Sequence, residues 1–265
     1  MIEIKDSILD ESVKKFFTKN LVCVDKNFTI LDTAKKIIET GHRRIPIIKK
    51  EGFFKRKKVF GIITAMDILD AYLRNTNFQN KIEDIMVRDF IFCYENDRMK
   101  NVIKKFQFSR RGGFPVLNKK NEIVGIITEK DIVNILKDVS IEIPIKNFMT
   151  HKPFFIKEGS FVNSLKILVN TRYRKLPIMN SNNEFLGLFI ERICLKTIIE
   201  NKNIEKLKNT DVCLKNIVKL NEEQKIEEAI NLMLEKNIGG IPIFKDEKLT
   251  GFLTERDIIE KIKIT

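Results

Sequence analysis

The sequence predicts an α/β (α+β) fold in which one β-α-β-β-α repeat occurs four times. Two patterns recur in phase along the chain. The first is a strand of the form h-Pro-h-h, where h is apolar, and the second is Gly-h-h-Thr-x-x-Asp, a strand that runs into a helix. The glycines of the second pattern recur about every 62–64 residues, at Gly61, Gly125, Gly187 and Gly251. This period exceeds that of most solenoid repeats, so each copy is expected to be a small folded module.

Each repeat opens with a short apolar strand, such as residues 21–24, and a helix follows it. In the first repeat Thr29 is the expected N-cap, Asp32 stands three residues on, and Gly41 is the expected C-cap. Apolar side chains at helical spacing between the caps give this helix one buried face. The h-Pro-h-h strand comes next. Its proline cannot donate to a sheet ladder, which predicts a strand start or an edge position.

A polar hairpin, such as residues 118–122, leads into the glycine-containing strand, and a second helix closes the repeat. The apolar strands imply sheets that are buried on at least one face, with helices covering that face. The four repeats are expected to span residues 12–75, 81–140, 144–203 and 208–265.

The composition is that of a globular protein with a sizeable core. Of the 265 residues, 43% are apolar and 32% are charged, which makes burial of a core feasible. The four cysteines are scattered singly, without metal-ligand spacing, so we expect free buried thiols and no metal site. The N-terminus has no apolar signal core, and no stretch approaches the length of a transmembrane helix. A soluble, cytoplasmic protein without membrane attachment is therefore expected.

The formal net charge of +13 has two explanations that stay open. It could indicate an anionic partner such as a nucleotide, nucleic acid or a membrane surface, or it could reflect lysine-rich coding. The longer hairpin of the first repeat, Lys49–Lys58, combines basic residues with two phenylalanines, a combination that can contact nucleic acid. A solvated hairpin tip is the favoured interpretation, because no other repeat carries a matching stripe.

The Thr-x-x-Asp part of the second pattern has both a structural and a functional explanation. A threonine followed three residues later by an acidic residue is close to a capping box, which alone would recur without any ligand. The same helix N-terminus also suits phosphate or ribose oxygens, and its carboxylate can accept from two adjacent ribose hydroxyls. The third repeat has Ile190 and Ile193 at these two places, so a ligand is not expected there.

A second asymmetry precedes each proline. The odd repeats are basic there, whereas the even repeats have the glycine pairs 112–113 and 239–240. Guanidinium groups suit multidentate phosphate contacts, and glycines permit close approach of the backbone. The alternative is that these basic residues are exposed loop charges beside helix caps and bind no ligand. The candidate phosphate ligands are Arg43, Arg44, Arg174 and Lys175.

These motifs, four times in phase, resemble the cystathionine β-synthase (CBS) domain over nearly the whole chain. A protein of four such repeats is similar to archaeal stand-alone CBS proteins and to the gamma subunit of AMP-activated protein kinase. The resemblance implies two modules of paired repeats, residues 1–140 and 141–265, each with a pseudo-twofold axis and with adenosine compounds bound between paired repeats. It also implies that the aspartate holds the ribose and the threonine the ribose or phosphate. Carried over to this chain, these residues are Thr64, Asp67, Thr128, Asp131, Thr254 and Asp257.

The expected function is regulation. The chain would bind AMP, ADP or ATP as a ligand, need no cofactor, and report the energy state to a separate regulated protein; a homodimer is compatible with this role. No phosphate-binding P-loop and no Ser-His-Asp or Cys-His arrangement can be identified, so an enzyme is not expected. Three alternatives stay open: a protein-interaction scaffold without a metabolite, a binder of S-adenosylmethionine or NAD, and a basic nucleic-acid binder, with nucleic acid the less expected partner.

Overall fold

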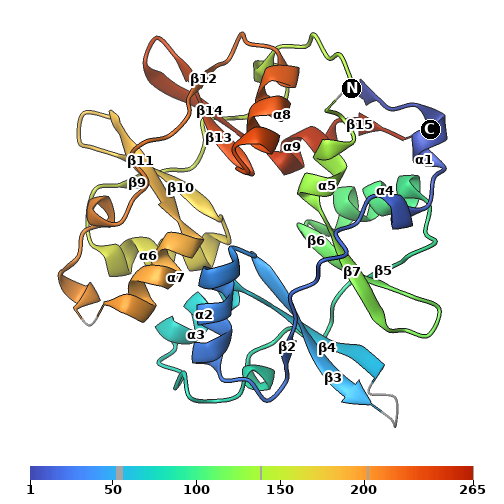
Figure 1. Cartoon of the computed structure of the whole chain (residues 1–265). Helices are drawn as coiled ribbons and strands as arrows, with labels where there is room; N and C mark the ends of the chain where they lie inside the picture. The colour runs from blue at the N-terminus through green and yellow to red at the C-terminus, as the bar shows by residue number, and fades with distance from the viewer. Residues whose placement is uncertain (52–55, 138, 202, 265) are drawn as a thin grey trace. The chain divides into compact units, whose positions relative to one another are not determined.

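The computed structural model describes residues 1–51, 56–137, 139–201 and 203–264 and divides into two compact units (Figure 1). Unit 1 comprises Met1–Leu21, Ile91–Pro153 and Val218–Thr265, and unit 2 comprises Val22–Phe90 and Phe154–Ile217. Unit 1 therefore holds the N-terminal segment and most of repeats 2 and 4, and unit 2 holds most of repeats 1 and 3. Each unit combines segments that are far apart in the sequence.

Both repeats of unit 2 have the predicted β-α-β-β-α order. Repeat 1 consists of β2 (Val24–Asp25), α2 (Ile30–Thr40), β3 (Arg44–Glu51), β4 (Arg56–Thr64) and α3 (Ala65–Leu73). Repeat 3 consists of β9 (Ile156–Lys157), α6 (Phe161–Thr171), β10 (Lys175–Met179), β11 (Phe185–Ile190) and α7 (Glu191–Glu200). The two three-stranded sheets have the orders β2-β3-β4 and β11-β10-β9. Helices α2 and α3 pack against α7, and α3 also packs against α6.

Unit 1 repeats this plan. Repeat 2 consists of β5 (Cys93–Tyr94), α4 (Met99–Ser109), β6 (Gly113–Leu117), β7 (Ile123–Thr128) and α5 (Glu129–Asn134). Repeat 4 consists of β12 (Leu220–Asn221), α8 (Ile226–Glu235), β13 (Gly240–Lys245), β14 (Lys248–Thr254) and α9 (Glu255–Glu260). Helix α5 packs against α8 and α9, and α4 packs against α9. The predicted α/β fold of four repeats is thus confirmed.

The helix caps follow the local sequence signals. The Thr29 hydroxyl accepts from the Asp32 N–H at 3.0 Å at the start of α2, and Gly41 ends that helix with φ 68°. Only glycine adopts this left-handed conformation without a steric cost. The same end of α6 is formed by Arg172, with φ 58°. This non-glycine exception matters for the site described below.

The proline of each h-Pro-h-h strand is the third residue of an inner strand of its sheet, so the prediction of a strand start or an edge position is wrong. In repeat 1, Pro46 is the third residue of β3 and faces Ile62 of β4. Ile62 donates its N–H away from β3, to the Val87 carbonyl at 2.9 Å. The parallel pairing of β3 with β2 involves only Ile47 and Ile48. Pro46 therefore occupies a site where no ladder bond requires its missing N–H.

The opening segments of consecutive repeats are exchanged between their sheets. Thr18, which lies before β2 at the start of repeat 1, exchanges two backbone hydrogen bonds with Ile126 of repeat 2, at 3.0 and 3.1 Å. Val87, which lies before β5 at the start of repeat 2, does the same with Ile62 of repeat 1, at 2.9 Å each. Repeats 3 and 4 show the same exchange: strand β8 (Thr150–His151) pairs with β14, and Leu214 bonds Leu188.

This exchange bears on the expected modules, residues 1–140 and 141–265. The compact units join alternate repeats through their helices, whereas the expected modules pair consecutive repeats. Consecutive repeats are nevertheless the ones that exchange their opening segments. The pairing of consecutive repeats into two modules stays a prediction.

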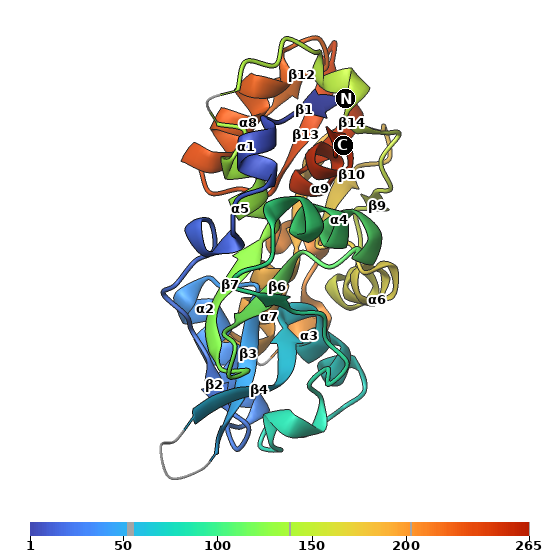
Figure 2. The same ribbon diagram turned by 90° about the vertical axis from the view of Figure 1, so that its right-hand side faces the viewer.

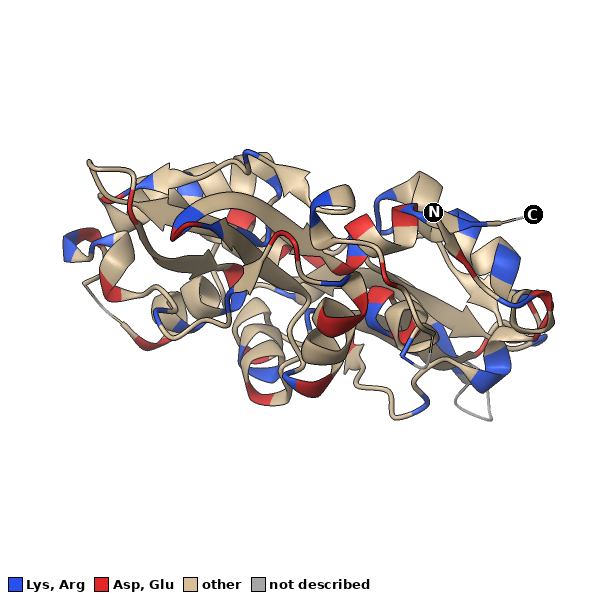
Figure 3. Cartoon of the chain, turned by 90° about the horizontal axis from the view of Figure 1, so that it is seen from above, with Lys and Arg blue, Asp and Glu red and all other residues tan. Residues whose placement is uncertain are grey.

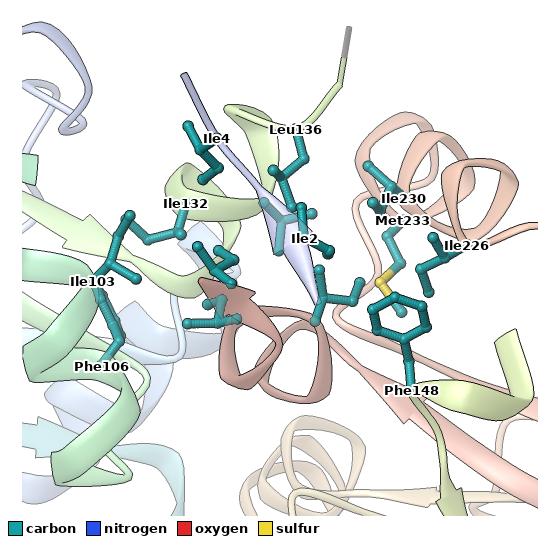
Figure 4. Close-up of a cluster of buried hydrophobic side chains, with 14 of the residues drawn as sticks. Ile2, Ile4, Ile103, Phe106, Ile132, Leu136, Phe148, Ile226, Ile230 and Met233 are labelled. Atoms are coloured by element: carbon teal, nitrogen blue, oxygen red, sulfur yellow. The ribbon is translucent and has the colours of Figure 1, made fainter. Parts of the chain in front are cut away.

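Each unit has its own hydrophobic core. Figure 4 shows the core of unit 1, to which Phe106 of α4, Leu136, Met233 of α8 and Ile2 of the N-terminal strand all contribute. That strand, β1 (Ile2–Glu3), pairs in parallel with β15 (Ile262–Lys263), and Figures 1 and 2 show the two side by side. The core of unit 2 includes Phe161 and Phe189, whose ring centroids are 5.6 Å apart.

The cysteines are free, as predicted, and their environments differ. Cys93 and Cys194 are buried, whereas Cys23 and Cys213 are partly exposed, so the expectation of buried thiols holds for two of the four. Burial raises the pKa of Cys93 to about 11, which leaves the thiol protonated at neutral pH. Within the described ranges, no helix is both long and apolar enough to cross a membrane.

Candidate functional site

The three Thr/Asp pairs form capping boxes at the starts of α3, α5 and α9. In repeat 1 the Thr64 hydroxyl and N–H both donate to Asp67 Oδ2, at 2.6 and 2.9 Å. Asp67 returns its N–H to the Thr64 hydroxyl at 3.3 Å. The structural explanation of the motif is therefore confirmed, and it uses only one of the two carboxylate oxygens.

The second oxygen, Oδ1, faces the exchanged segment in both repeats of unit 1. The Thr18 hydroxyl lies 3.4 Å from Asp131 Oδ1, and the Thr150 hydroxyl lies 3.4 Å from Asp257 Oδ1. These distances are long for an O–H···O hydrogen bond, so the oxygens retain capacity to accept from a ligand. Each of these repeats thus presents two threonine hydroxyls around one carboxylate. We call these the unit 1 Thr/Asp groups: Thr18, Thr128 and Asp131, and Thr150, Thr254 and Asp257.

Burial raises the pKa of Asp131 and of Asp257, and hydrogen bonds from the capping threonines oppose the rise. An ionised carboxylate in this setting is short of hydration. A ligand that donates hydroxyl groups to Oδ1 would replace part of that lost hydration. The two carboxylates are therefore suited to accept from paired hydroxyls, such as those of a ribose.

The raised pKa values predict how stability changes with pH. Because each folded-state pKa lies above the ordinary 3.8, the folded protein takes up these protons at higher pH than the unfolded chain. The contribution of the two carboxyls to the free energy of unfolding should therefore rise as the pH falls towards 3.8. Urea unfolding of the wild type and of Asp131→Asn/Asp257→Asn, from pH 7 downwards, measures the difference. As the pH falls, the free energy of unfolding of the wild type should increase relative to that of the variant. A difference that does not change with pH would contradict the raised pKa values of Asp131 and Asp257.

Repeat 3 departs from this pattern, as its sequence predicts. Ile190 precedes α7 and makes no side-chain cap hydrogen bond, yet the helix runs from Glu191 to Glu200. The fold therefore does not require the Thr/Asp pair. This favours a role for the pair beyond capping in the repeats that retain it.

Repeat 1 has a different environment around its aspartate. Arg172, at the left-handed end of α6 in repeat 3, places Nη1 3.3 Å from Asp67 Oδ1. Val87 pairs with Ile62 of repeat 1 in the same way that Thr18 pairs with Ile126 of repeat 2, so a valine stands here at the position of that threonine. The oxygen that faces a threonine in unit 1 thus faces a guanidinium group in unit 2.

The predicted phosphate ligands all lie in unit 2, together with Arg192. Burial raises the pKa of Glu191, the buried first residue of α7, and the positive charges of Arg174, Arg43, Arg44 and Arg192 oppose the rise and favour the ionised carboxylate. We call these four arginines the arginine cluster. Lys175 follows Arg174 at the start of β10. Both glycine pairs fall in unit 1, so neither Arg43–Arg44 nor Arg174–Lys175 lies in the same unit as a glycine pair. Figure 3 shows that lysine and arginine also occur on many other elements.

Four functional candidates were not predicted from the sequence: Thr18, Thr150, Arg172 and Glu191. A signal for the two threonines exists, because residues 13–18 (VKKFFT) and 145–150 (IKNFMT) share one pattern. No local signal marks Arg172, since its partner Asp67 is 105 residues away.

Two further expectations concern metals and the basic hairpin. Among the described residues, no cluster of three or more histidine, cysteine, aspartate or glutamate side chains could hold a metal ion. The predicted hairpin Lys49–Lys58 is described only as far as Glu51 and from Arg56 onwards. Its two phenylalanines lie outside the described residues.

Comparison with known proteins identifies relatives of full length. Protein MJ1225 of Methanocaldococcus jannaschii is 22% identical over 271 residues, which cover 91% of this chain and 95% of that protein. Its crystal structure, described as that of a candidate archaeal homologue of g-AMPK, matches with a TM-score of 0.86 at 21% identity and covers 94% of this chain and 99% of the other. A conserved protein from Pyrococcus horikoshii matches with a TM-score of 0.63 at 20% identity over 94% of this chain and 98% of the other. At these identities the likeness establishes the fold.

One named enzyme is a partial relative. The L-aspartate semialdehyde sulfurtransferase of M. jannaschii is 32% identical over 120 residues, which cover 45% of this chain and only 22% of that enzyme. A match of this extent shares a domain and leaves the larger part of the enzyme without a counterpart.

The family model for the CBS domain matches residues 13–74, 82–138 and 210–264, which are repeats 1, 2 and 4. These repeats are the ones that retain the Thr/Asp pair. The resemblance predicted from the motifs is confirmed. The chain belongs to the CBS domain family.

Proposed function

We propose that the chain is a regulatory protein that binds adenine nucleotides (AMP, ADP or ATP) and reports cellular energy state to a separate partner protein. The observation that carries the proposal is the pair of unit 1 Thr/Asp groups. In each, one oxygen of a half-buried carboxylate is held by a capping box, and the other keeps capacity to accept. A ribose presents two adjacent hydroxyls, which is the donor pattern that such an oxygen and its flanking threonines suit.

The basic residues of unit 2 support binding of the phosphate groups. The positive charges of Arg43, Arg44 and Arg174 act on the buried Glu191 carboxylate, and guanidinium groups bind phosphate with several hydrogen bonds at once. Thr64 and Asp67 of the same unit are proposed to hold ribose, and Lys175 to contact phosphate. Unit 2 thus contains both the candidate ribose ligands and the cations, which are the two kinds of group that a nucleotide would contact.

The proposed sites are not equivalent, which suits a sensor. Asp131 and Asp257 face threonines, Asp67 faces Arg172, and repeat 3 has isoleucines instead. Non-equivalent sites can differ in their preference for AMP, ADP and ATP. Signalling then requires that each ligand stabilise one conformation of the protein more than another.

Calorimetric titration with AMP, ADP and ATP tests the proposal. The variants are Asp67→Ala, Asp131→Ala and Asp257→Ala. At least one nucleotide should bind with a dissociation constant well below about 1 mM, and loss of a charged acceptor should weaken its site by about 10- to 100-fold. If no nucleotide binds in that range, or if none of the variants weakens binding, the proposal fails.

The matched control is Asp32→Ala. The Asp32 carboxylate accepts from the Thr29 hydroxyl at 2.7 Å at the start of α2, so this variant loses a comparable cap outside the Gly-h-h-Thr motif. It should leave nucleotide affinity unchanged. The same titration with S-adenosylmethionine and NAD distinguishes the other adenosine ligands. An interaction scaffold predicts a melting temperature that no adenosine compound raises.

A further inference from the structure

Glu191 is a buried carboxylate at a position shared by all four repeats. It is the first residue of α7 and only 4% exposed. The same position holds Glu129 and Glu255 in unit 1, which are 2% and 5% exposed, and Ala65 in repeat 1. Unit 1 thus has two buried carboxylates at this position, whereas unit 2 has one.

The surroundings of Glu191 differ from those of Glu129. In unit 1, Arg256 Nη2 lies 2.6 Å from Glu129 Oε1 and forms an ion pair between repeats 4 and 2. In unit 2, the positive charges acting on Glu191 come from the four residues of the arginine cluster, which belong to repeats 1 and 3. Glu191 is therefore a negative charge within the group of cations proposed to receive phosphate.

Backbone contacts hold the start of α7 and the basic residues together. The Glu191 N–H donates to the Arg174 carbonyl at 3.0 Å, and the Ala65 N–H donates to the Arg43 carbonyl at 3.4 Å. The Arg192 guanidinium donates to the Gly41 carbonyl at 2.8 Å. A phosphate group bound by these arginines would be close to the Glu191 carboxylate and would be repelled by it.

We propose that Glu191 determines the charge selectivity of the arginine cluster, as a resident anion that reduces the advantage of a triphosphate ligand over a monophosphate ligand. The inference rests on the proposed function only in that the cluster receives phosphate groups. Arginines alone favour the more highly charged ligand, because attraction grows with ligand charge. A nearby carboxylate repels each ligand in proportion to the same charge. It therefore allows AMP to compete with ATP, which a sensor of their ratio requires.

The test uses inorganic phosphate, pyrophosphate and tripolyphosphate, which have no adenine or ribose. Their affinities are measured by calorimetry on the full chain for the wild type, Glu191→Gln and Glu200→Gln. Glu200 is the control, because it ends the same helix with an exposed side chain, 4.0 Å from Lys196. Loss of the repulsion from Glu191 should tighten binding by about threefold for each unit of ligand charge. Glu191→Gln should therefore bind phosphate about tenfold and tripolyphosphate about 100-fold more tightly than the wild type does.

An equal change for all three ions, weaker binding, or the same effect from Glu200→Gln would overturn the proposal, as would absence of binding by both the wild type and Glu191→Gln. If Glu191→Gln does not fold, Ala65→Glu decides. It adds a carboxylate at the equivalent position of repeat 1, where the other three repeats have glutamate. The ratio of tripolyphosphate affinity to phosphate affinity should then fall. An unchanged or higher ratio would contradict the role proposed for Glu191.

These results are distinguishable from failure of the proposed function. If adenine nucleotides bind and Glu191→Gln leaves the ratio of affinities unchanged, this inference alone is wrong. If the inorganic ions follow their charge and no nucleotide binds, the proposed nucleotide function is wrong and the selectivity of the cluster stands.

Discussion

Replacement of Gly125 by alanine should lower the free energy of unfolding by about 3 kcal/mol and displace the backbone at Thr18. A Cβ atom at Gly125 would lie 2.2 Å from the Phe17 ring and 2.6 Å from the Thr18 carbonyl oxygen. The exchanged segment cannot move aside freely, because Thr18 is bonded to Ile126 in both directions. Phe17 is also buried in the core of unit 1.

Urea unfolding of the wild type, Gly125→Ala and Gly159→Ala measures this effect. Gly159 is the control, since its added Cβ would meet only the Lys157 carbonyl oxygen, at 4.0 Å. That variant should stay within about 0.5 kcal/mol of the wild type. Because Thr18 flanks Asp131, Gly125→Ala should also weaken any ligand bound there. Equal stability of the two variants would mean that the exchanged segment does not pack on Gly125.

The motif glycines show what could be predicted from the sequence and what could not. Their recurrence established the repeat and its β-α-β-β-α order, because caps, turns and apolar strands are local signals. The reason for the glycine is not local. At Gly61 an added Cβ would lie 2.6 Å from Met86 Sδ, and at Gly251 it would lie 2.2 Å from Met149 Sδ. Each of these glycines is required by the opening segment of another repeat.

The site was predictable to the same extent. The Thr/Asp pairs and the loss of the pair at Ile190 could be identified because each occupies a fixed place in the motif. The hydroxyl of Thr18 near Asp131 depends on a segment 113 residues away in the sequence. The edge position predicted for Pro46 failed for a related reason. Periodicity could not show that its neighbour Ile62 directs its N–H to Val87.

The ion pair between Glu129 and Arg256 leads to the second large effect. Arg256→Met should lower the free energy of unfolding by about 3 kcal/mol, because it removes the cation 2.6 Å from a carboxylate that is 2% exposed. Lys130→Met is the matched control, since Lys130 has the equivalent position in repeat 2. Its ammonium group makes an exposed contact with Asn237 Oδ1 at 2.9 Å, so its loss should cost less than about 0.5 kcal/mol.

The double variant separates the ion pair from the two side chains. In Glu129→Gln/Arg256→Met neither charge is left, so the double variant should be more stable than Arg256→Met alone. Urea unfolding of both single variants and the double variant gives the coupling energy, expected to be about 2 kcal/mol. Additive losses would show that Arg256 contributes by packing only. Strong coupling would show that the buried charge of Glu129 is balanced by Arg256, whereas in unit 2 the charges of the arginine cluster oppose the burial-induced rise in the pKa of Glu191.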